Sequence, residues 1–425
     1  MYRVWNALGH NAALLLAGIG MGLAWAALAP GTYNNAVEFV LLEGVGIGHP
    51  HEVAGEVRRV LTVEFLVNGM LMSVIFAVAF KELWEALILK RGALRGRKAA
   101  APLLATAGGM IGPVAVYLGL VAFLGPDAWA ALARGWTVPM ATDIALAFVV
   151  GRAVFGTGHP AVRVLLLLAI TDDLVAMALL TVLHPAGTVQ PAWLLVPLAA
   201  GAGAFGLFNW LPRHLDRGHP AQPNTAWVRR RLSLWPYAVA GAISWYGVQQ
   251  SGLNPALGLL PVVPALPHAD RAFGLFSEAE RYLNDLLNHA EHLLRRPVGA
   301  ILFLFGLCNA GVDLGAAGPV SLFVLAALLL GKPLGVVLFG GPVARALRLP
   351  VPPGMRPREL AVIGLVAGIG LTVPLLAAGS AFDAGPVLDG IDAADGARIG
   401  LLLSLGAAPL ALLAARLMGV RRRPG

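Results

Sequence analysis

The chain has 425 residues, of which 58% are hydrophobic and only 13% are charged, and its formal net charge is +8. Soluble domains carry about 25% charged residues, so this composition excludes a soluble globular protein and predicts a polytopic membrane protein. The basic residues gather in short loops between apolar runs, a pattern that sets membrane topology and does not indicate nucleic-acid binding. The single cysteine, Cys308, excludes a disulfide framework and a cysteine-based metal site.

The first half of the chain contains six predicted apolar spans. The polar segment Thr32–Arg59 is expected to leave the membrane between the first two spans, with its His49-Pro50-His51 motif in a solvated loop. The alternative for this motif is metal binding, although a metal site needs three or four ligands. Loops rich in Lys and Arg follow the second and sixth spans, at residues 90–98 and 213–231, and are expected to be cytoplasmic. The six spans are about Ala12–Ala29, Val60–Ile88, Ala101–Leu124, Val138–Val154, Val162–Leu183 and Trp193–Trp210.

The second half contains six more predicted spans. Residues Asp270–Arg296 are expected to form an amphipathic cytoplasmic helix, and the aspartate-rich segment Phe382–Ala397 an outside loop. An even number of spans places both termini in the cytoplasm. We therefore expect an all-α fold of about 12 transmembrane helices in one integral membrane domain over residues 1–425. The six spans are about Leu234–Gln249, Leu253–Leu266, Val298–Val312, Val320–Phe339, Leu360–Ala378 and Ile399–Leu417.

Two adjacent carboxylates, Asp172 and Asp173, lie in the otherwise apolar fifth span. One ionised group at a bilayer centre costs roughly 2.5–3.5 kcal/mol on insertion scales, so a chain that keeps two is expected to use them. Neighbouring residues on a helix point about 100° apart. We expect one aspartate to bind an ion directly and the other to pair with a buried cation. The structural alternative is that one member caps a neighbouring helix and the other forms a static ion pair.

A lysine also lies deep in the membrane, because Lys332 occupies the centre of the tenth span. A cation at that depth needs a carboxylate partner, for which either Asp172 or Asp173 is suitable. The alternative is that Lys332 lies near a helix end and extends its amine to the lipid headgroups.

The fourth and eleventh spans each contain an interruption. Thr142 and Asp143 follow Pro139 in the fourth span, and the Gly-rich stretch Gly368–Pro374 in the eleventh cannot hold a regular helix well. Matching interruptions in two halves of a chain point to a transporter binding site formed where two broken helices cross. Asp143 would then offset two positive helix N-termini, and Lys332 two negative C-termini, besides any direct role.

These features predict exchange of a small cation for protons. Sodium and lithium are hard cations that prefer oxygen ligands, and Thr142 can add an oxygen to those of the aspartates. A carboxylate binds a proton or a cation, but not both well, so competition with alternating access gives obligatory exchange without a cofactor. Three alternatives stay open: a sodium-coupled transporter of another substrate, a passive channel, and an intramembrane aspartyl protease. The protease would place its two aspartates on different helices, where they share one proton.

Five motifs, in this order and spacing, resemble those of the NhaA-type Na⁺/H⁺ antiporters of bacterial inner membranes. The first is Ala-Thr-Asp-Ile-Ala, and the last is Gly-Ile-Gly-Leu-Thr. The resemblance extends from the first span to the C-terminal tail. The motifs occupy residues 141–145, 172–174, 309–312, 331–335 and 368–372.

The resemblance implies a role for each matched residue. It identifies Asp172 and Asp173 as the ion-binding and proton-exchanging pair, with Thr142 completing the Na⁺ site, and Lys332 as the partner of Asp172. It also implies an inverted-repeat fold whose site is built by spans 3–5 and 10–12, a separate dimerisation domain, electrogenic exchange, a homodimer in the bilayer of the inner membrane, and a part in pH homeostasis. The supporting residues are Thr142, Asp143, Lys332, Gly368, Gly370 and Thr372.

The chain departs from the family pattern at positions linked to regulation. Gly69 follows Asn68 where the family has an acidic residue, and Asn254 stands where the family has a histidine linked to pH response. Part of a cytoplasmic charged cluster is kept after the second span, and another lies near the start of the ninth. The candidate regulatory residues are therefore Glu82, Glu85, Asn254 and Glu291.

Overall fold

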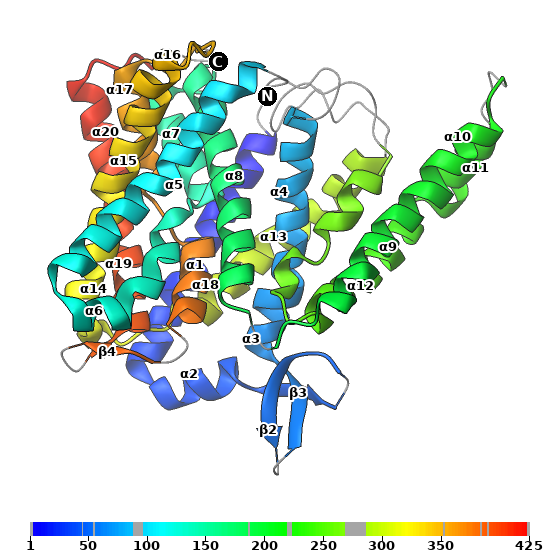
Figure 1. Ribbon diagram of the computed structural model, residues 1–425, viewed down its shortest axis with the longest axis horizontal. Coiled ribbons are helices and arrows are strands. Elements are labelled where there is room, and N and C mark those ends of the chain that lie inside the picture. The colour runs from blue at the N-terminus through cyan, green and yellow to red at the C-terminus, as the bar shows by residue number, and fades with distance from the viewer. Residues whose placement is uncertain are drawn as a thin grey trace. The chain divides into compact units, whose positions relative to one another are not determined.

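The computed structural model describes a protein that is helical almost throughout (Figure 1). The chain divides into two compact units. Unit 1 comprises Met1–Tyr33, Leu94–Leu180 and Leu302–Gly425, and unit 2 comprises Asn34–Ala93 and Thr181–Ile301. The described residues are 3–44, 46–53, 56–87, 97–185, 188–218, 223–267, 286–351, 353–382, 385–388 and 391–422.

Unit 1 contains two pairs of short helices joined by brief non-helical segments, in addition to longer helices. Its elements are α1 (Arg3–Leu28), α5 (Arg97–Phe123), α6 (Pro126–Leu132), η2 (Ala133–Met140), α7 (Ile144–Phe155), η9 (Leu314–Ala316), α14 (Pro319–Ala326), η10 (Ala327–Gly331), α15 (Lys332–Leu338), η11 (Phe339–Val343), α16 (Ala344–Ala346), α17 (Pro357–Ala367), α18 (Thr372–Ala381), β4 (Val387–Leu388), β5 (Ile391–Asp392), α19 (Ala393–Leu403), η12 (Ser404–Gly406) and α20 (Ala407–Leu417).

Unit 2 combines a small antiparallel sheet with apolar helices, and three helices cross the unit boundaries. Those three are α2 (Pro30–Val37), α8 (Pro160–Leu183) and α13 (Leu286–Asn309). The elements of unit 2 itself are β1 (Val40–Glu43), β2 (His49–Val53), β3 (Glu56–Thr62), α3 (Val63–Phe65), η1 (Leu66–Leu71), α4 (Met72–Leu87), η3 (Pro191–Leu194), α9 (Leu195–Phe205), η4 (Gly206–Trp210), α10 (Leu211–Leu215), α11 (Pro223–Trp227), η5 (Val228–Leu232), α12 (Trp235–Gln250), η6 (Pro255–Leu257) and η7 (Leu260–Ala265).

The helices confirm a multi-pass membrane protein. In the described part of the chain, seven helices are long and apolar enough to cross a membrane, or nine if each of two bent pairs counts as one span. The predicted seventh span is α12, whose 16 residues are fewer than the 18 required in this count. The predicted eighth and ninth spans correspond to the shorter apolar helices Pro255–Ala265 and Pro297–Asn309. The total of twelve spans therefore stays a prediction.

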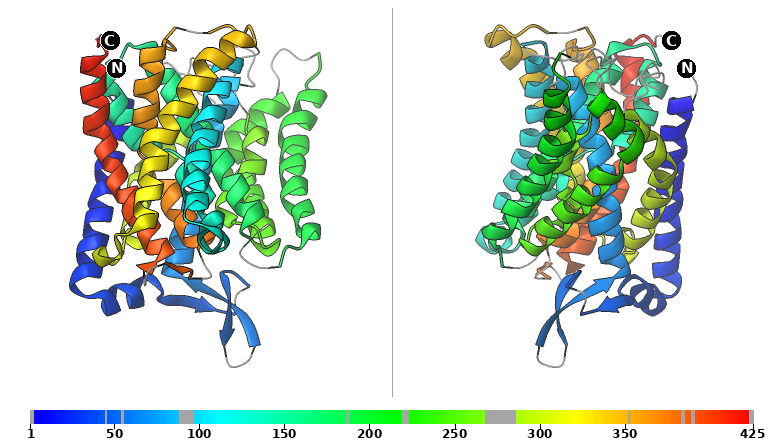
Figure 2. Two further views of the ribbon diagram at one scale, coloured as in Figure 1. Left: turned by 60° about the vertical axis from the view of Figure 1, so that its left-hand side comes forward. Right: turned by 90° about the vertical axis from the view of Figure 1, so that its right-hand side faces the viewer.

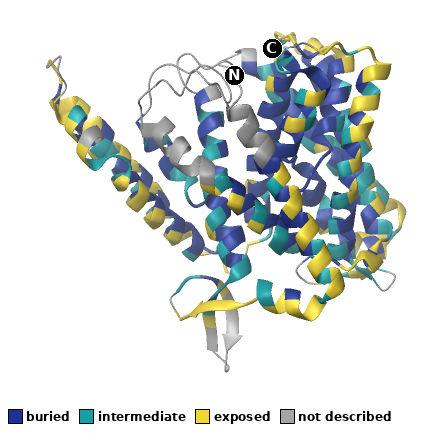
Figure 3. Ribbon diagram, turned by 180° about the vertical axis from the view of Figure 1, so that it is seen from behind, coloured by how far each residue is buried: buried dark blue, intermediate teal, exposed yellow. Residues whose placement is uncertain are grey.

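Burial differs sharply between two of the long spans. In an apolar 18-residue stretch of α8, which carries the aspartate pair, 78% of the residues are buried, against 22% in the corresponding stretch of the span Pro191–Leu215, which includes α9. Much of α9 and α12 is exposed (Figure 3), and apolar side chains such as Leu195 and Trp235 contribute to that surface. Apolar side chains on a membrane helix can face lipid, whereas the burial of α8 marks it as a core element.

The predicted solvated loop within Thr32–Arg59 is wrong, because the structure forms α2 and a three-stranded sheet there, in the order β1-β3-β2. The His49-Pro50-His51 motif lies in β2, where His49 pairs with Val60 of β3. Strand β3 contains Val57 and Val60, and β-branched residues fit an extended backbone. Its antiparallel ladders supply the backbone hydrogen bonds that a loop would have left to water.

A second difference concerns the expected cytoplasmic helix at Asp270–Arg296. Residues 268–285 lie outside the described part of the chain. From Leu286 onward, α13 continues without a break through Pro297 into the predicted ninth span and ends at Asn309. One proline removes one backbone hydrogen bond, which a membrane helix with packed neighbours tolerates.

Small residues bring the backbones of α5 and α15 together within unit 1 (Figure 2). Gly108 and Gly112 of α5 lie against the carbonyl oxygens of Gly335 and Gly331, with no room for a Cβ on either α5 glycine. Glycines four residues apart permit such close approach between membrane helices. Because Lys332 follows Gly331 directly, this contact holds the lysine at a defined depth.

Candidate functional site

Two bent helix pairs in unit 1 contain the predicted interruptions. The helices Pro126–Met140 and Ile144–Phe155 are bent by 55°, and Pro357–Ala367 and Thr372–Ala381 by 57°. The connecting residues, 141–143 and 368–371, are not helical. Each break leaves the carbonyl groups of the first half and the N–H groups of the second half without helical partners.

The two breaks supply partners to each other. The Asp143 backbone N–H donates to the Ile369 carbonyl at 2.8 Å, and the Thr142 hydroxyl lies 3.0 Å from the Ala367 carbonyl. Irregular backbone at membrane depth is tolerated where it is buried in protein and its polar groups are paired. Contact between the breaks is thus established, whereas a crossing of the two complete helices stays a prediction.

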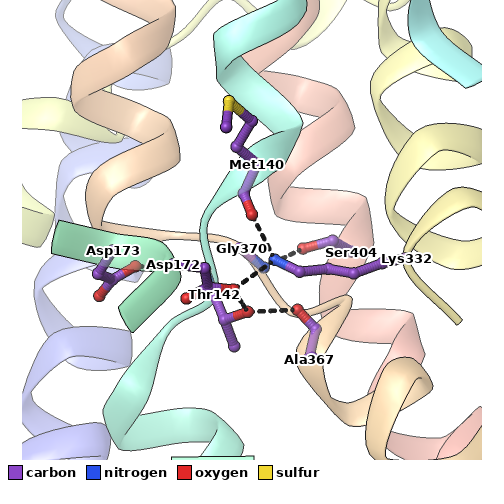
Figure 4. Close-up of polar contacts among 8 residues, drawn as sticks. All are labelled: Met140, Thr142, Asp172, Asp173, Lys332, Ala367, Gly370 and Ser404. Carbon is purple, nitrogen blue, oxygen red and sulfur yellow. Dashed lines mark hydrogen bonds and ion pairs between the residues drawn. The ribbon is translucent and has the colours of Figure 1, made fainter. Parts of the chain in front are cut away.

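Both aspartates of α8 reach the first break and meet Thr142 through different atoms (Figure 4). The Thr142 hydroxyl lies 2.7 Å from Asp172 Oδ2. The backbone N–H of Thr142 donates to Asp173 Oδ1 at 3.2 Å. The angular separation of adjacent helix residues therefore does not prevent the two carboxylates from converging.

Lys332 lies beside Asp172, within the same cluster. Its Nζ is 3.1 Å from Asp172 Oδ2 and donates to the Met140 carbonyl at 2.8 Å. Met140 ends the first half of the first broken helix, so this carbonyl belongs to a negative helix C-terminus. Since Lys332 is completely buried, the alternative in which its amine reaches the headgroups is wrong.

Asp143 lies near the N-termini of α7 and α18, the second halves of the two broken helices. Its Oδ1 accepts a hydrogen bond from the Leu146 N–H at 2.8 Å and caps α7. The carboxylate also faces Thr372, the first residue of α18. A negative charge at two helix N-termini is electrostatically favourable, which is the role expected for Asp143 from its sequence context.

The two glycines of the second break are tightly surrounded. Gly368 ends α17, and a Cβ there would lie 2.8 Å from the Leu328 carbonyl oxygen. A Cβ on Gly370 would lie 3.2 Å from the Ala141 carbonyl oxygen, within the other break. The Gly370 N–H donates to the Ser404 hydroxyl at 3.2 Å. At Gly368, neighbouring backbone occupies the space of a side chain, so any larger residue would force the chain to move. The space at Gly370 is tight but not filled.

Sequence reasoning missed three contributors to this site: the carbonyls of Met140 and Ala367, and the hydroxyl of Ser404. A backbone carbonyl has no signature in the residue that carries it. Ser404 lies in an apolar span, as Ser73, Ser244 and Ser321 also do. No pattern in the sequence distinguishes it from a serine that bonds only within its own helix.

Charge and oxygen atoms favour a cation here. Asp143, Asp172, Asp173 and Lys332 are all buried in this unit, and the lysine forms an ion pair with Asp172 alone among the aspartates. Uncompensated buried charge is costly. Within the described part of the chain, Asp172 Oδ1 and Asp143 Oδ2 have no hydrogen-bond partner. A hard cation or a proton bound to such an oxygen would lower that cost.

The candidate regulatory residues all belong to unit 2. Glu82 and Glu85 belong to unit 2, where each contacts the buried Lys81 of the same helix, at 3.1 and 3.2 Å. Asn254, also in unit 2, caps η6 by accepting from the Ala256 N–H at 3.0 Å. Glu291 is on α13, and its side chain lies outside what the structure describes.

Comparison with known proteins gives close relatives along the full chain. Residues 4–415 match the family described as "Na+/H+ antiporter 1". The chain is 51% identical over 424 residues to the Na(+)/H(+) antiporter NhaA of Jannaschia sp. (strain CCS1), with 100% of both chains covered. It is 39% identical over 424 residues to the Na(+)/H(+) antiporter NhaA of Geobacter sulfurreducens, with 99% of both chains covered.

A more distant likeness is found among solved structures. The sodium proton antiporter MjNhaP1 from Methanocaldococcus jannaschii has a TM-score of 0.48 and 17% identity, over 96% of this chain and 91% of that one, and nothing about the fold is concluded from it. The relatives confirm the resemblance seen in the sequence. They are named as antiporters, so the predicted class, a transporter and not an enzyme, is also confirmed.

Proposed function

We propose that this chain, which belongs to the Na⁺/H⁺ antiporter 1 family, exchanges Na⁺ or Li⁺ for protons across a membrane by alternating access. The observation that carries the proposal is the buried cluster of Thr142, Asp172, Asp173 and Lys332. It combines carboxylate oxygens, a hydroxyl and a positive charge at the meeting point of two helix breaks, which is where transporters of this kind bind ions.

Competition for the two carboxylates would produce exchange. Asp172 and Asp173 hold Na⁺ together with an oxygen of Thr142 in one state, and bind protons in the other. Asp172 forms an ion pair with Lys332, and a cation that enters the site would replace the lysine as its partner. The Thr142 hydroxyl has one hydrogen and two acceptors within reach, so it can release Asp172 and turn to the Ala367 carbonyl when the cation arrives.

The remaining groups of the site support this exchange. Asp143 holds the N-terminus of α7, while Gly368, Gly370 and Thr372 shape the second break. Exchange of more than one proton per sodium ion makes the cycle electrogenic, so the membrane potential can drive it. No cofactor takes part.

The cellular setting is part of the same proposal. The chain is a single transporter domain of the bacterial inner membrane, with both termini in the cytoplasm, and forms a homodimer in the lipid bilayer. It contributes to pH homeostasis. Glu82, Glu85, Asn254 and Glu291 are the residues proposed to regulate activity.

The test uses everted membrane vesicles with an imposed pH gradient and a pH-sensitive dye, to which NaCl, LiCl or KCl is added between pH 6 and 9. Sodium or lithium should collapse the gradient with the wild type and not with Asp172→Asn or Asp173→Asn. Each substitution removes a carboxylate that would bind both the cation and the proton, so exchange should fall to the background level.

A matched control is Asp216→Asn, because Asp216 lies just beyond the span Pro191–Leu215 and should leave exchange intact. If no cation collapses the gradient with the wild type at any pH, cation–proton exchange is wrong. Sodium flux that needs no proton counterflow would instead indicate a channel or a sodium-coupled transporter of another substrate.

A further inference from the structure

Ser404 joins the second helix break to a different part of unit 1. It is fully buried at the start of η12, the tight turn between α19 and α20. Its hydroxyl donates to the Leu401 carbonyl at 2.5 Å and accepts from the Gly370 N–H at 3.2 Å (Figure 4). The serine thus connects its own helix to the non-helical segment 368–371.

The direction of these two bonds is set by the chemistry of the groups. A hydroxyl has one hydrogen, and a carbonyl can only accept, so the Ser404 hydrogen goes to Leu401 and its lone pairs face Gly370. The Gly370 N–H is one of the donors that the break removes from helical pairing. Alanine at position 404 would leave this N–H buried without a partner, which is unfavourable.

Gly370 lies in the second break, at the place where that break contacts the first one. The preceding residue, Ile369, accepts the Asp143 N–H through its carbonyl. Gly370 itself lies against the Ala141 carbonyl, so close that a Cβ would be 3.2 Å from that oxygen. The segment around Gly370 is thus linked to residues 141–143, which include Thr142, the residue that contacts both aspartates of α8.

We propose that Ser404 is a positioning residue of the cation site, which sets cation affinity by holding the second break at the Gly370 N–H. Ser404 does not itself contact the cation. It acts through Gly370 on Thr142 and Asp143, and through Thr142 on Asp172 and Asp173. The proposal rests on the proposed function, since it assigns a role at the same cation site.

The experiment compares Ser404→Ala with Ser404→Thr, which restores the hydroxyl, and with a control serine elsewhere in unit 1. Ser321 is the matched control. It is buried, accepts from the Gly318 N–H at 3.2 Å and donates to the Gly396 carbonyl at 2.7 Å, which joins α14 to α19. Ser321→Ala therefore removes the same pair of bonds at a place that contacts neither break.

Binding of NaCl and LiCl to the purified full chain is measured by isothermal titration calorimetry, together with Tm and with exchange in vesicles. Ser404→Ala should raise the Kd about 5- to 10-fold, as expected for loss of one buried hydrogen bond of about 1–1.4 kcal/mol. Ser404→Thr should bind more tightly than Ser404→Ala. Ser321→Ala should lower Tm by about as much as Ser404→Ala does, but it should leave the Kd unchanged.

Three results would overturn the proposal: an unchanged Kd in Ser404→Ala, a Kd raised equally in Ser321→Ala, or no recovery in a folded Ser404→Thr. If the wild type exchanges cations for protons but Ser404→Ala has an unchanged Kd, the positioning role of Ser404 is wrong and the proposed function stands. A wild type that neither binds nor exchanges Na⁺ or Li⁺ removes both.

Discussion

Each unit of the molecule buries one lysine with two acidic side chains, but the two clusters are built differently. In unit 2, Lys81, Glu82 and Glu85 all lie on α4, and the lysine Nζ contacts both carboxylates. In unit 1, Lys332 lies on α15 and both aspartates lie on α8, and the lysine forms an ion pair with Asp172.

The difference lies in which groups complete each cluster. Lys81 contacts the adjacent Glu82 and also Glu85, which lies one turn further along the same helix. The partners of the unit 1 aspartates include Thr142 and, through Lys332, the Met140 carbonyl, which belong to a helix break. A cluster within one helix is preserved when that helix moves as a body, whereas a cluster across a break changes when the break moves. The second kind suits a site that must release its ion.

The largest expected effect comes from removing the lysine of each cluster. Lys332→Met leaves Asp172 buried without its cation and should lower the free energy of unfolding by about 3–5 kcal/mol, and Lys81→Met should be similarly destabilised. NaCl should restore much of the Tm of Lys332→Met, because Na⁺ takes the place of the lysine beside Asp172, and should not restore that of Lys81→Met.

The measurement is Tm of the purified variants in NaCl or in choline chloride at equal concentration, so that ionic strength is matched. Equal recovery of both variants in NaCl would show that the two clusters do not differ in their access to a cation.

A smaller effect is expected at Thr142, the neutral side chain that contacts Asp172 in the unit 1 cluster. Thr142→Val keeps the volume but removes the hydroxyl that bonds Asp172, so the Kd for Na⁺ should rise about tenfold, the equivalent of about 1.4 kcal/mol. Thr142→Ser keeps the hydroxyl and should stay close to wild type. Titration calorimetry with NaCl gives both values, and equal affinities in the valine and serine variants would exclude the hydroxyl as a contributor.

The smallest effect concerns an acid whose partners are neutral donors. Desolvation opposes the ionisation of Asp216, but hydrogen bonds from Thr225 and Asn224 outweigh it and lower its pKa to about 2. A pKa depressed below the unfolded value of about 3.9 stabilises the fold above that pH, and the contribution is lost as pH falls toward 2.

Asp216→Asn cannot titrate, so the Tm advantage of the wild type over this variant should shrink between about pH 4 and pH 2. Thermal unfolding of both proteins across this range is the measurement. A difference in Tm that is constant with pH would mean that the Asp216 charge does not contribute to stability.

Several features of the site follow from local sequence and were predicted from it. Paired carboxylates in an apolar span are costly wherever that span packs, so Asp172 and Asp173 stand out without a structure. Proline and glycine disfavour helix on their own, so Pro139 and Gly370 indicated the two breaks. The region Thr32–Arg59 was misjudged because its polar composition resembles that of a loop, while its strands are stabilised by pairing with one another.

By itself, the sequence determined the membrane class, the places where helices break and the residues that carry charge inside them, because hydropathy and backbone propensity act along a few neighbouring residues. Only the tertiary structure decided that Lys332 pairs with Asp172, that the Met140 and Ala367 carbonyls face the site, and that Ser404 holds Gly370. These choices depend on which atoms of distant segments come within about 3 Å of one another, the range of a hydrogen bond. That proximity is set by close helix packing, such as the contact of Gly112 with Gly331.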